Sequence, residues 1–96
     1  MRYKNSELII PNAPLKKGDR NLGTMYLQLA LQRVLKLTGK HDIVKSENGY
    51  FGPKTEFAVQ KFQSTHHLHS DGRYTEPTQK VLREVLHARN NNIHKQ

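Results

Sequence analysis

The chain has 96 residues and a formal net charge of +8, from 16 Lys plus Arg against 8 Asp plus Glu. This length allows one small domain without a large catalytic cleft, and the basic balance favours a polyanionic partner such as nucleic acid, a teichoic-acid-like polymer, anionic lipid or an acidic protein. The absence of cysteine excludes a disulfide framework and a cysteine nucleophile, and no run approaches the ~18 apolar residues of a membrane span.

Residues 1–14 are predicted to form an N-terminal arm. The apolar run 8–10 can pack as a short extended piece, whereas Pro11 and Pro14 exclude a helix. Because Pro11 ends the run, it is too short for the core of a signal peptide. We therefore expect a chain made in the cytoplasm, which reaches a cell wall only after lysis, in a phage particle or with a partner.

Apolar residues at helical spacing predict three helices and an all-α fold. The first helix, from about 22 to 38, carries two apolar stripes and should be central, with Gly39 ending it in a left-handed conformation. The remaining predicted segments are a polar loop at 40–47, a helix at 53–64, a His-rich connector at 65–70, a helix at 76–88 and a polar tail at 89–96. The domain itself is expected to span residues 15–88.

The second and third predicted helices belong to a sequence repeat. Its copies share, at a constant offset of 23 residues, the pairs Asn48-Gly49 and Asp71-Gly72, the aromatics Phe51 and Tyr74, and the threonines Thr55 and Thr78. An Asx-Gly pair reverses the chain sharply, and the Pro that follows in each copy belongs in the first turn of a helix. Each unit is therefore a turn followed by a short amphipathic helix, and each needs the other to cover its apolar face.

The pattern of the whole chain resembles the peptidoglycan-binding domain found beside cell-wall hydrolases and in matrix metalloprotease prodomains. The resemblance covers about residues 15–86. The matching residues are Leu31-Gln32, Leu35, Gly39, Gly49, Phe51-Gly52, Thr55, Ala58-Val59, Phe62-Gln63, Leu68, Asp71-Gly72, Thr78 and Leu82, with Leu15 and Gly18 upstream. Three positions depart from the family pattern, which usually has Asp at Asn48 and Gly at His67 and Thr75.

The resemblance implies a non-catalytic three-helix domain that binds peptidoglycan through the stem peptide and adjoining sugar. As a mechanism, we expect a shallow cleft where the two turns meet the helix N-termini, whose free N–H groups suit carboxylates. The candidate ligand-binding residues are Tyr50 and Tyr74 for stacking on sugar and Asn48, Thr55, Arg73 and Thr78 for polar contacts. Gln32 and Gln63 are instead expected to tie loop backbone to the helices.

No motif predicts an enzyme, a metal site or a cofactor. His66, His67 and His69 have suitable types for zinc, but they lack the His-x-x-x-His spacing of a helical ligand pair and are better explained as a solvated connector. The sequence also contains no Gly-x-Ser-x-Gly elbow and no phosphate-cradling Gly-rich loop.

Two other functions remain open at the level of sequence. A small basic three-helix protein can bind nucleic acid, with phosphate contacts from Arg73, Lys80, Arg83, His87 and Arg89. Alternatively, the same fold can act as a protein–protein interaction module, inside the cell or in a phage particle. The repeat favours neither of these readings over peptidoglycan binding.

Overall fold

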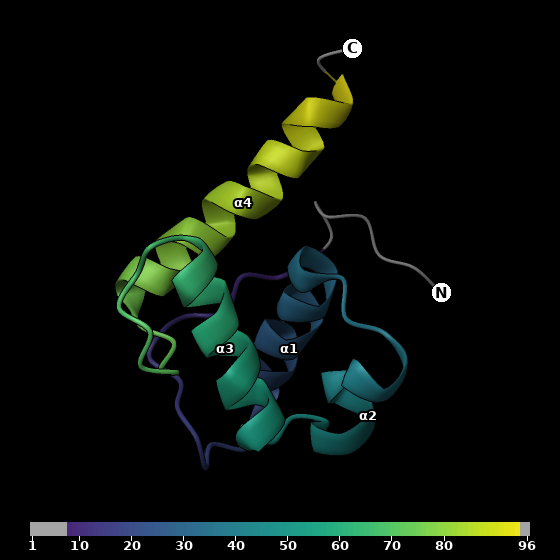
Figure 1. Ribbon diagram of the computed structural model, residues 1–96, viewed down its shortest axis with the longest axis vertical. Helices are drawn as coiled ribbons and strands as arrows, with labels where there is room; N and C mark the ends of the chain where they lie inside the picture. Colours follow the sequence, from purple (N-terminus) through teal and green to yellow (C-terminus); the bar gives the residue numbers. More distant parts are fainter. Residues whose placement is uncertain (1–7, 95–96) are drawn as a thin grey trace.

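The computed structural model describes residues 8–94, with side chains from residue 8 to residue 88 (Figure 1). The elements in chain order are α1 (Leu22–Leu35), the 3-10 turn η2 (Gly39–His41), α2 (Ile43–Glu47), α3 (Pro53–Thr65) and α4 (Glu76–His94). The described part contains no β-strand, only isolated antiparallel bridges between Leu15 and Tyr74 and between Arg20 and Tyr50. The predicted all-α fold is therefore confirmed, with one short helix more than the three expected.

Helix α1 is the central element, as its two apolar stripes predicted. It begins where the Asn21 side chain accepts a hydrogen bond from the backbone N–H of Thr24 (2.8 Å). It ends at Leu35 rather than near residue 38, because Lys36 adopts the left-handed conformation (φ 56°) that was expected of Gly39. Gly39 also has a positive φ, of 60°, but it starts the next turn instead of ending α1.

The segment 40–47 is not the polar loop that its composition predicted. It folds into η2 and α2, and the Asp42 side chain caps α2 by accepting from the backbone N–H of Lys45 (3.1 Å). Of the two apolar residues in this segment's centre, Ile43 is 1% exposed and Val44 is half-buried. Burial of one isoleucine and one N-cap thus order a stretch that has no helical apolar stripe of its own.

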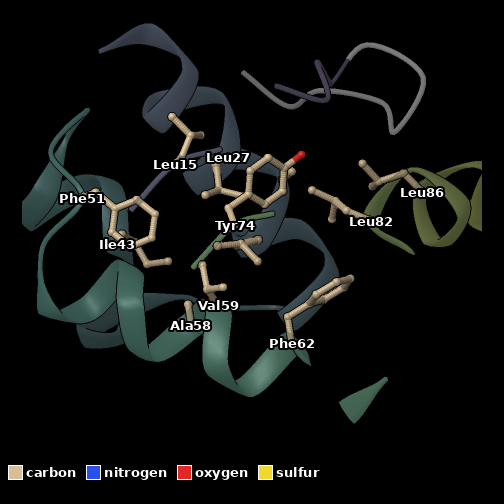
Figure 2. Packing of buried hydrophobic residues seen from close by; sticks show 12 residues of the cluster. Leu15, Leu27, Ile43, Phe51, Ala58, Val59, Phe62, Tyr74, Leu82 and Leu86 are labelled. Carbon is tan, nitrogen blue, oxygen red and sulfur yellow. The ribbon is translucent and has the colours of Figure 1, made fainter. Parts of the chain in front are cut away.

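The core gathers side chains from all four α-helices and from the turns between them. Figure 2 shows the Tyr74 ring in the middle of this cluster, with Leu27 of α1 and Leu82 of α4 beside it. The buried hydrophobic residues are Leu15, Leu27, Ala30, Leu31, Ile43, Phe51, Ala58, Val59, Phe62, Tyr74, Leu82 and Leu86. Both repeat aromatics, Phe51 and Tyr74, are fully buried, so each turn contributes one large ring to the shared core.

The C-terminal end of the chain differs from the predicted tail, whereas the described part of the N-terminal arm agrees with the prediction. Helix α4 leaves the body of the domain and continues to His94, so the backbone of 89–94 is helical where a frayed tail was expected (Figure 1). The described part of the arm, residues 8–14, contains no helix. The N–H of Ala13 donates to the side-chain oxygen of Gln79 (3.0 Å), and the carbonyl of Pro11 accepts from the Tyr74 hydroxyl (2.8 Å). Residues 1–7 of the arm and 95–96 of the tail lie outside the described residues. Within 8–94, none of the helices has both the length and the apolar character required to cross a bilayer.

Candidate functional site

The first turn of the repeat is organised around a buried glutamine of α1. The side-chain amide of Gln28 donates to the carbonyl oxygens of Glu47 (3.0 Å) and Tyr50 (2.9 Å) and to the hydroxyl of Thr55 (2.9 Å). Its amide oxygen accepts from the backbone N–H of Gly49 (2.9 Å). One side chain therefore makes four hydrogen bonds that hold the turn and the start of α3 against α1.

A glutamine of α3 organises the second turn in the same way. The amide of Gln63 donates to the Asp71 carboxylate (3.2 Å), the Arg73 carbonyl (2.8 Å) and the Thr78 hydroxyl (3.1 Å), and its oxygen accepts from the N–H of Gly72 (3.0 Å). The N–H of Arg73 also donates to Asp71 (2.9 Å). This bond, aided by the one from Gln63, holds the pKa of Asp71 below its ordinary value.

The two turns identify a pair of structurally equivalent glutamines. Gln28, not Gln32, occupies the position that corresponds to Gln63. Gln32 does tie backbone to its helix, as predicted, but it accepts from the N–H of Val44 in α2 (2.8 Å). Sequence spacing could not choose between the two glutamines because both lie on α1, four residues apart, next to a leucine.

Burial corrects three of the six predicted ligand contacts. Tyr74 and Thr55 are 0% exposed and Thr78 is 3% exposed, so these side chains offer no surface for a ligand. Both threonines accept from the organising glutamines, and the Tyr74 hydroxyl donates to the Pro11 carbonyl (2.8 Å). Their roles in this structure are to hold the turns and to fasten the N-terminal arm.

The N-terminus of α3 is also unavailable to a ligand carboxylate, contrary to the predicted mechanism. The nearly buried carboxylate of Glu47 accepts from the N–H groups of Gly52 (3.2 Å), Lys54 (2.8 Å) and Thr55 (2.8 Å). It also accepts from the Thr55 hydroxyl (2.8 Å). The favourable place for an anion at this helix end is therefore filled by the chain itself.

The same contact explains why the two copies differ at the start of their helices. A Cβ on Gly52 would come within 2.6 Å of a Glu47 carboxylate oxygen, so only glycine fits there. In the second copy, Thr75 stands at the equivalent position and Ser70 stands where the first copy has Glu47. Because Ser70 has no carboxylate to place against position 75, a side chain is accommodated there, which accounts for one departure from the family pattern.

Asn48, Tyr50 and Arg73 are the predicted contacts that reach the surface. Asn48 and Arg73 are exposed, but they belong to different turns. Tyr50 is half-buried, and the guanidinium of Arg20 lies 4.4 Å from its ring centroid. Stacking by Arg20 covers one face of the ring, which leaves Tyr50 less open to a sugar than its sequence position suggested.

A groove of about 340 Å³ lies on another part of the surface, between the end of α1, η2 and the start of α3. Its volume is at the lower end of the range for ligand sites, which is about 300–1,000 Å³. Apolar side chains make up most of its lining. The residues that line it are Leu35, Leu37, Lys40, His41, Ile43, Pro53, Lys54, Phe57, Ala58 and Lys61. We call it the α3 groove.

The α3 groove presents one aromatic ring between two lysines. Lys54, Phe57 and Lys61 follow an i, i+3, i+7 spacing and therefore share one face of α3. This face is turned away from the buried positions of the helix, and Phe57 is 67% exposed. Phe57 was not predicted from the sequence to be a ligand contact. The available signal was its position, since it lies outside the stripe formed by 55, 58, 59 and 62.

The charges at the α3 groove are of one sign. Lys40, Lys54, Lys61 and the imidazole of His41 line it, and no Asp or Glu does. Within residues 8–88, the ion pair found is between Lys17 and Glu56 (3.8 Å), away from this lining. Lys54 donates through its ammonium group to the Lys40 carbonyl (3.1 Å), which holds it beside η2. The groove therefore combines an apolar floor with cations that lack a carboxylate partner in the described part of the chain.

The histidine-rich connector forms no cluster suited to a metal. His66 packs its ring against Phe62, with 4.5 Å between the centroids, and His67 has a positive φ of 60°. Among the described residues, no three His, Asp or Glu side chains come together as metal ligands would. The positive φ explains why the family pattern has glycine at position 67, since other residues adopt this conformation at a cost.

Comparison with known proteins agrees with this architecture. The family model described as "Putative peptidoglycan binding domain" matches residues 24–82, which include both glutamine-centred turns. The chain is also similar to N-acetylmuramoyl-L-alanine amidase CwlL of Bacillus licheniformis, at 36% identity over 74 residues. That alignment covers 77% of this chain but 20% of the amidase, so the chain spans about a fifth of that relative's length. By the extent of the family match, the chain belongs to the peptidoglycan-binding domain family.

Proposed function

We propose that the protein is a non-catalytic module that binds bacterial peptidoglycan at the cell wall, with the stem peptide and adjoining sugar seated in the α3 groove. The observation that carries this proposal is the exposed Phe57 ring, set between Lys54 and Lys61 above an apolar floor. Membership of the family supports the same ligand class.

The chemistry of the ligand matches that of the groove. Stem peptides carry carboxylates and methyl groups, and muramyl sugars have apolar C–H faces. An exposed aromatic ring can cover such a face, while an ammonium group at the rim pairs with a carboxylate. Because Glu47 fills the α3 N-terminus, these lysines take over the anion-binding role that was expected of the helix end.

The surface residues of the turns have a secondary place in this proposal. Asn48, Tyr50 and Arg73 remain proposed contacts to parts of the glycan strand that extend beyond the groove. None of them lines the α3 groove, so their replacement by alanine should reduce binding less than replacement of Phe57 does.

Retention on purified sacculi tests the proposal with a matched pair of variants. Phe57 and Leu22 are both 67% exposed, and they lie near opposite ends of α1, Leu22 at its start and Phe57 beside its end. We expect Phe57→Ala to lower the retained fraction strongly and Leu22→Ala to leave it unchanged, with both variants keeping the wild-type circular dichroism spectrum. Equal retention of the Phe57→Ala variant and the wild type would exclude this groove as the wall-binding site.

A salt titration distinguishes wall binding from binding to nucleic acid. Affinity for duplex DNA that rests on phosphate contacts falls steeply as the salt concentration rises. Stem-peptide binding that also rests on Phe57 and the apolar floor should fall less. Tight binding to duplex DNA together with no retention on sacculi would replace this proposal with the nucleic-acid function.

A further inference from the structure

The α3 groove has a charge pattern that goes beyond binding peptidoglycan in general. Its titratable lining residues are three lysines, Lys40, Lys54 and Lys61, and His41. Two carboxylates on neighbouring elements, Asp42 and Glu47, are not part of the lining. Asp42 accepts from the first turn of α2, and Glu47 is turned into the start of α3. Neither of these two carboxylates therefore neutralises the positive charge of the groove.

Stem peptides occur with their side carboxyl groups free or converted to carboxamides. The two forms have nearly the same shape, so the groove has room for both. They differ in charge, because a carboxylate can pair with an ammonium group and a carboxamide cannot. The discrimination must therefore come from the lysines of the rim rather than from the fit of the floor.

We propose that the α3 groove selects stem peptides whose side carboxyl groups are free and ionised over stem peptides in which they are amidated. This inference rests on the proposed function, and it names the chemical form of the wall that the module recognises. Lys54 and Lys61 are the specificity-determining residues, since they flank Phe57 on the same face of α3.

Two synthetic peptides test this selection by titration calorimetry at physiological salt. In the first, L-Ala–γ-D-Glu–meso-diaminopimelate, the two side carboxyl groups, one on the glutamate and one on the diaminopimelate, are free. In the second, each of these two groups is a carboxamide. We expect the free form to bind about tenfold more tightly, as two solvent-exposed ion pairs of ordinary strength would give. In the double variant Lys54→Gln/Lys61→Gln, the two peptides should bind within about twofold of one another.

The control variant has the same change of net charge outside the groove. Lys16 and Lys80 are exposed and do not line the α3 groove, so Lys16→Gln/Lys80→Gln should keep the tenfold preference. If the preference for the free-carboxyl peptide survives in the Lys54/Lys61 variant, or disappears in the control variant, the selection does not arise in the α3 groove.

The failure of this inference can be told apart from failure of the proposed function. If the wild type binds both peptides equally while Phe57→Ala still loses retention on sacculi, the selection is wrong and the wall-binding groove stands. If neither peptide binds although wild-type sacculus retention is lost in Phe57→Ala, the selection is again overturned, and the groove binds a different part of the wall. If the wild-type protein is not retained on sacculi at all, both proposals are wrong.

Discussion

Gln28 of α1 and Gln63 of α3 hold the two turns of the domain with three equivalent hydrogen bonds each. Each amide oxygen accepts from the N–H of a turn glycine, at 2.9 Å from Gly49 and 3.0 Å from Gly72, and each amide nitrogen donates to a buried threonine. The sequence repeat is therefore a repeat of polar networks as well as of apolar positions. The stability of each turn depends on a glutamine that comes from the preceding long helix.

Replacement of the organising glutamine should cost far more stability than replacement of its neighbour on α1. We expect Gln28→Ala to lower the free energy of unfolding by about 2–4 kcal/mol, because it leaves a cavity, removes four hydrogen bonds and deprives the N–H of Gly49 of its acceptor. Gln32→Ala removes one bond, to the N–H of Val44, and should cost about 1 kcal/mol. Urea denaturation measures both, and similar losses in the two variants would contradict the assignment of Gln28.

The Glu47 carboxylate should stabilise the start of α3. In Glu47→Gln, an amide NH₂ group must face backbone N–H donors, so we expect a loss of about 2 kcal/mol in the free energy of unfolding. Glu56→Gln is the control. Its ion pair with Lys17 is long, at 3.8 Å, and half-exposed, so its removal should change stability by less than about 0.5 kcal/mol. A cost for Glu47→Gln no larger than that of the control would show that the cap is unimportant.

Tyr74 should make the domain sensitive to alkaline pH. Burial raises the pKa of Tyr74 above its ordinary value of 10.0, so the folded state favours the protonated phenol. The stabilisation is fully present below pH 10, and it is lost as the pH rises further, because the unfolded chain then releases a proton that the folded chain retains.

Tyr74→Phe isolates this effect from the titration of other groups. At neutral pH, the variant lacks the bond to the Pro11 carbonyl and should be about 1 kcal/mol less stable. Above pH 10, its stability should fall less steeply than that of the wild type, so the difference between the two narrows. Urea denaturation from neutral pH to about pH 11 tests this. Parallel pH profiles would mean that Tyr74 ionises as readily in the folded state as in the unfolded one.

His67 should carry a local conformational cost that glycine removes. Its φ of 60° is in the left-handed region, and its side chain is exposed. We expect His67→Gly to raise the free energy of unfolding by about 0.5–1 kcal/mol, since the relief of strain exceeds the added entropy of the unfolded chain. His69→Gly, at an exposed position without a positive φ, should be neutral or destabilising. A loss of stability in His67→Gly would show that the histidine contributes contacts that outweigh its backbone strain.

The sequence alone determined the features of this protein that depend on short spacings. The Asx-Gly turns, the helix starts after them and the apolar stripes of three helices all follow from residues within one turn or one helix of each other, and a family pattern could be recognised from them. The positive φ at position 67 was foreshadowed in the same way, by a residue that departs from a glycine position. These elements are set by local backbone chemistry, which is written directly in the order of the residues.

The tertiary structure decided which side chains are available to a ligand. Tyr74 was predicted to stack on sugar, but its hydroxyl donates a hydrogen bond to the carbonyl of Pro11, 63 positions earlier in the chain. Gln28 and Gln32 could not be separated until α2 and the first turn were placed around α1. Phe57 is exposed because it lies outside the face of α3 that packs against the core. Burial depends on what packs against a residue from distant parts of the chain, and local spacing carries little information about those contacts.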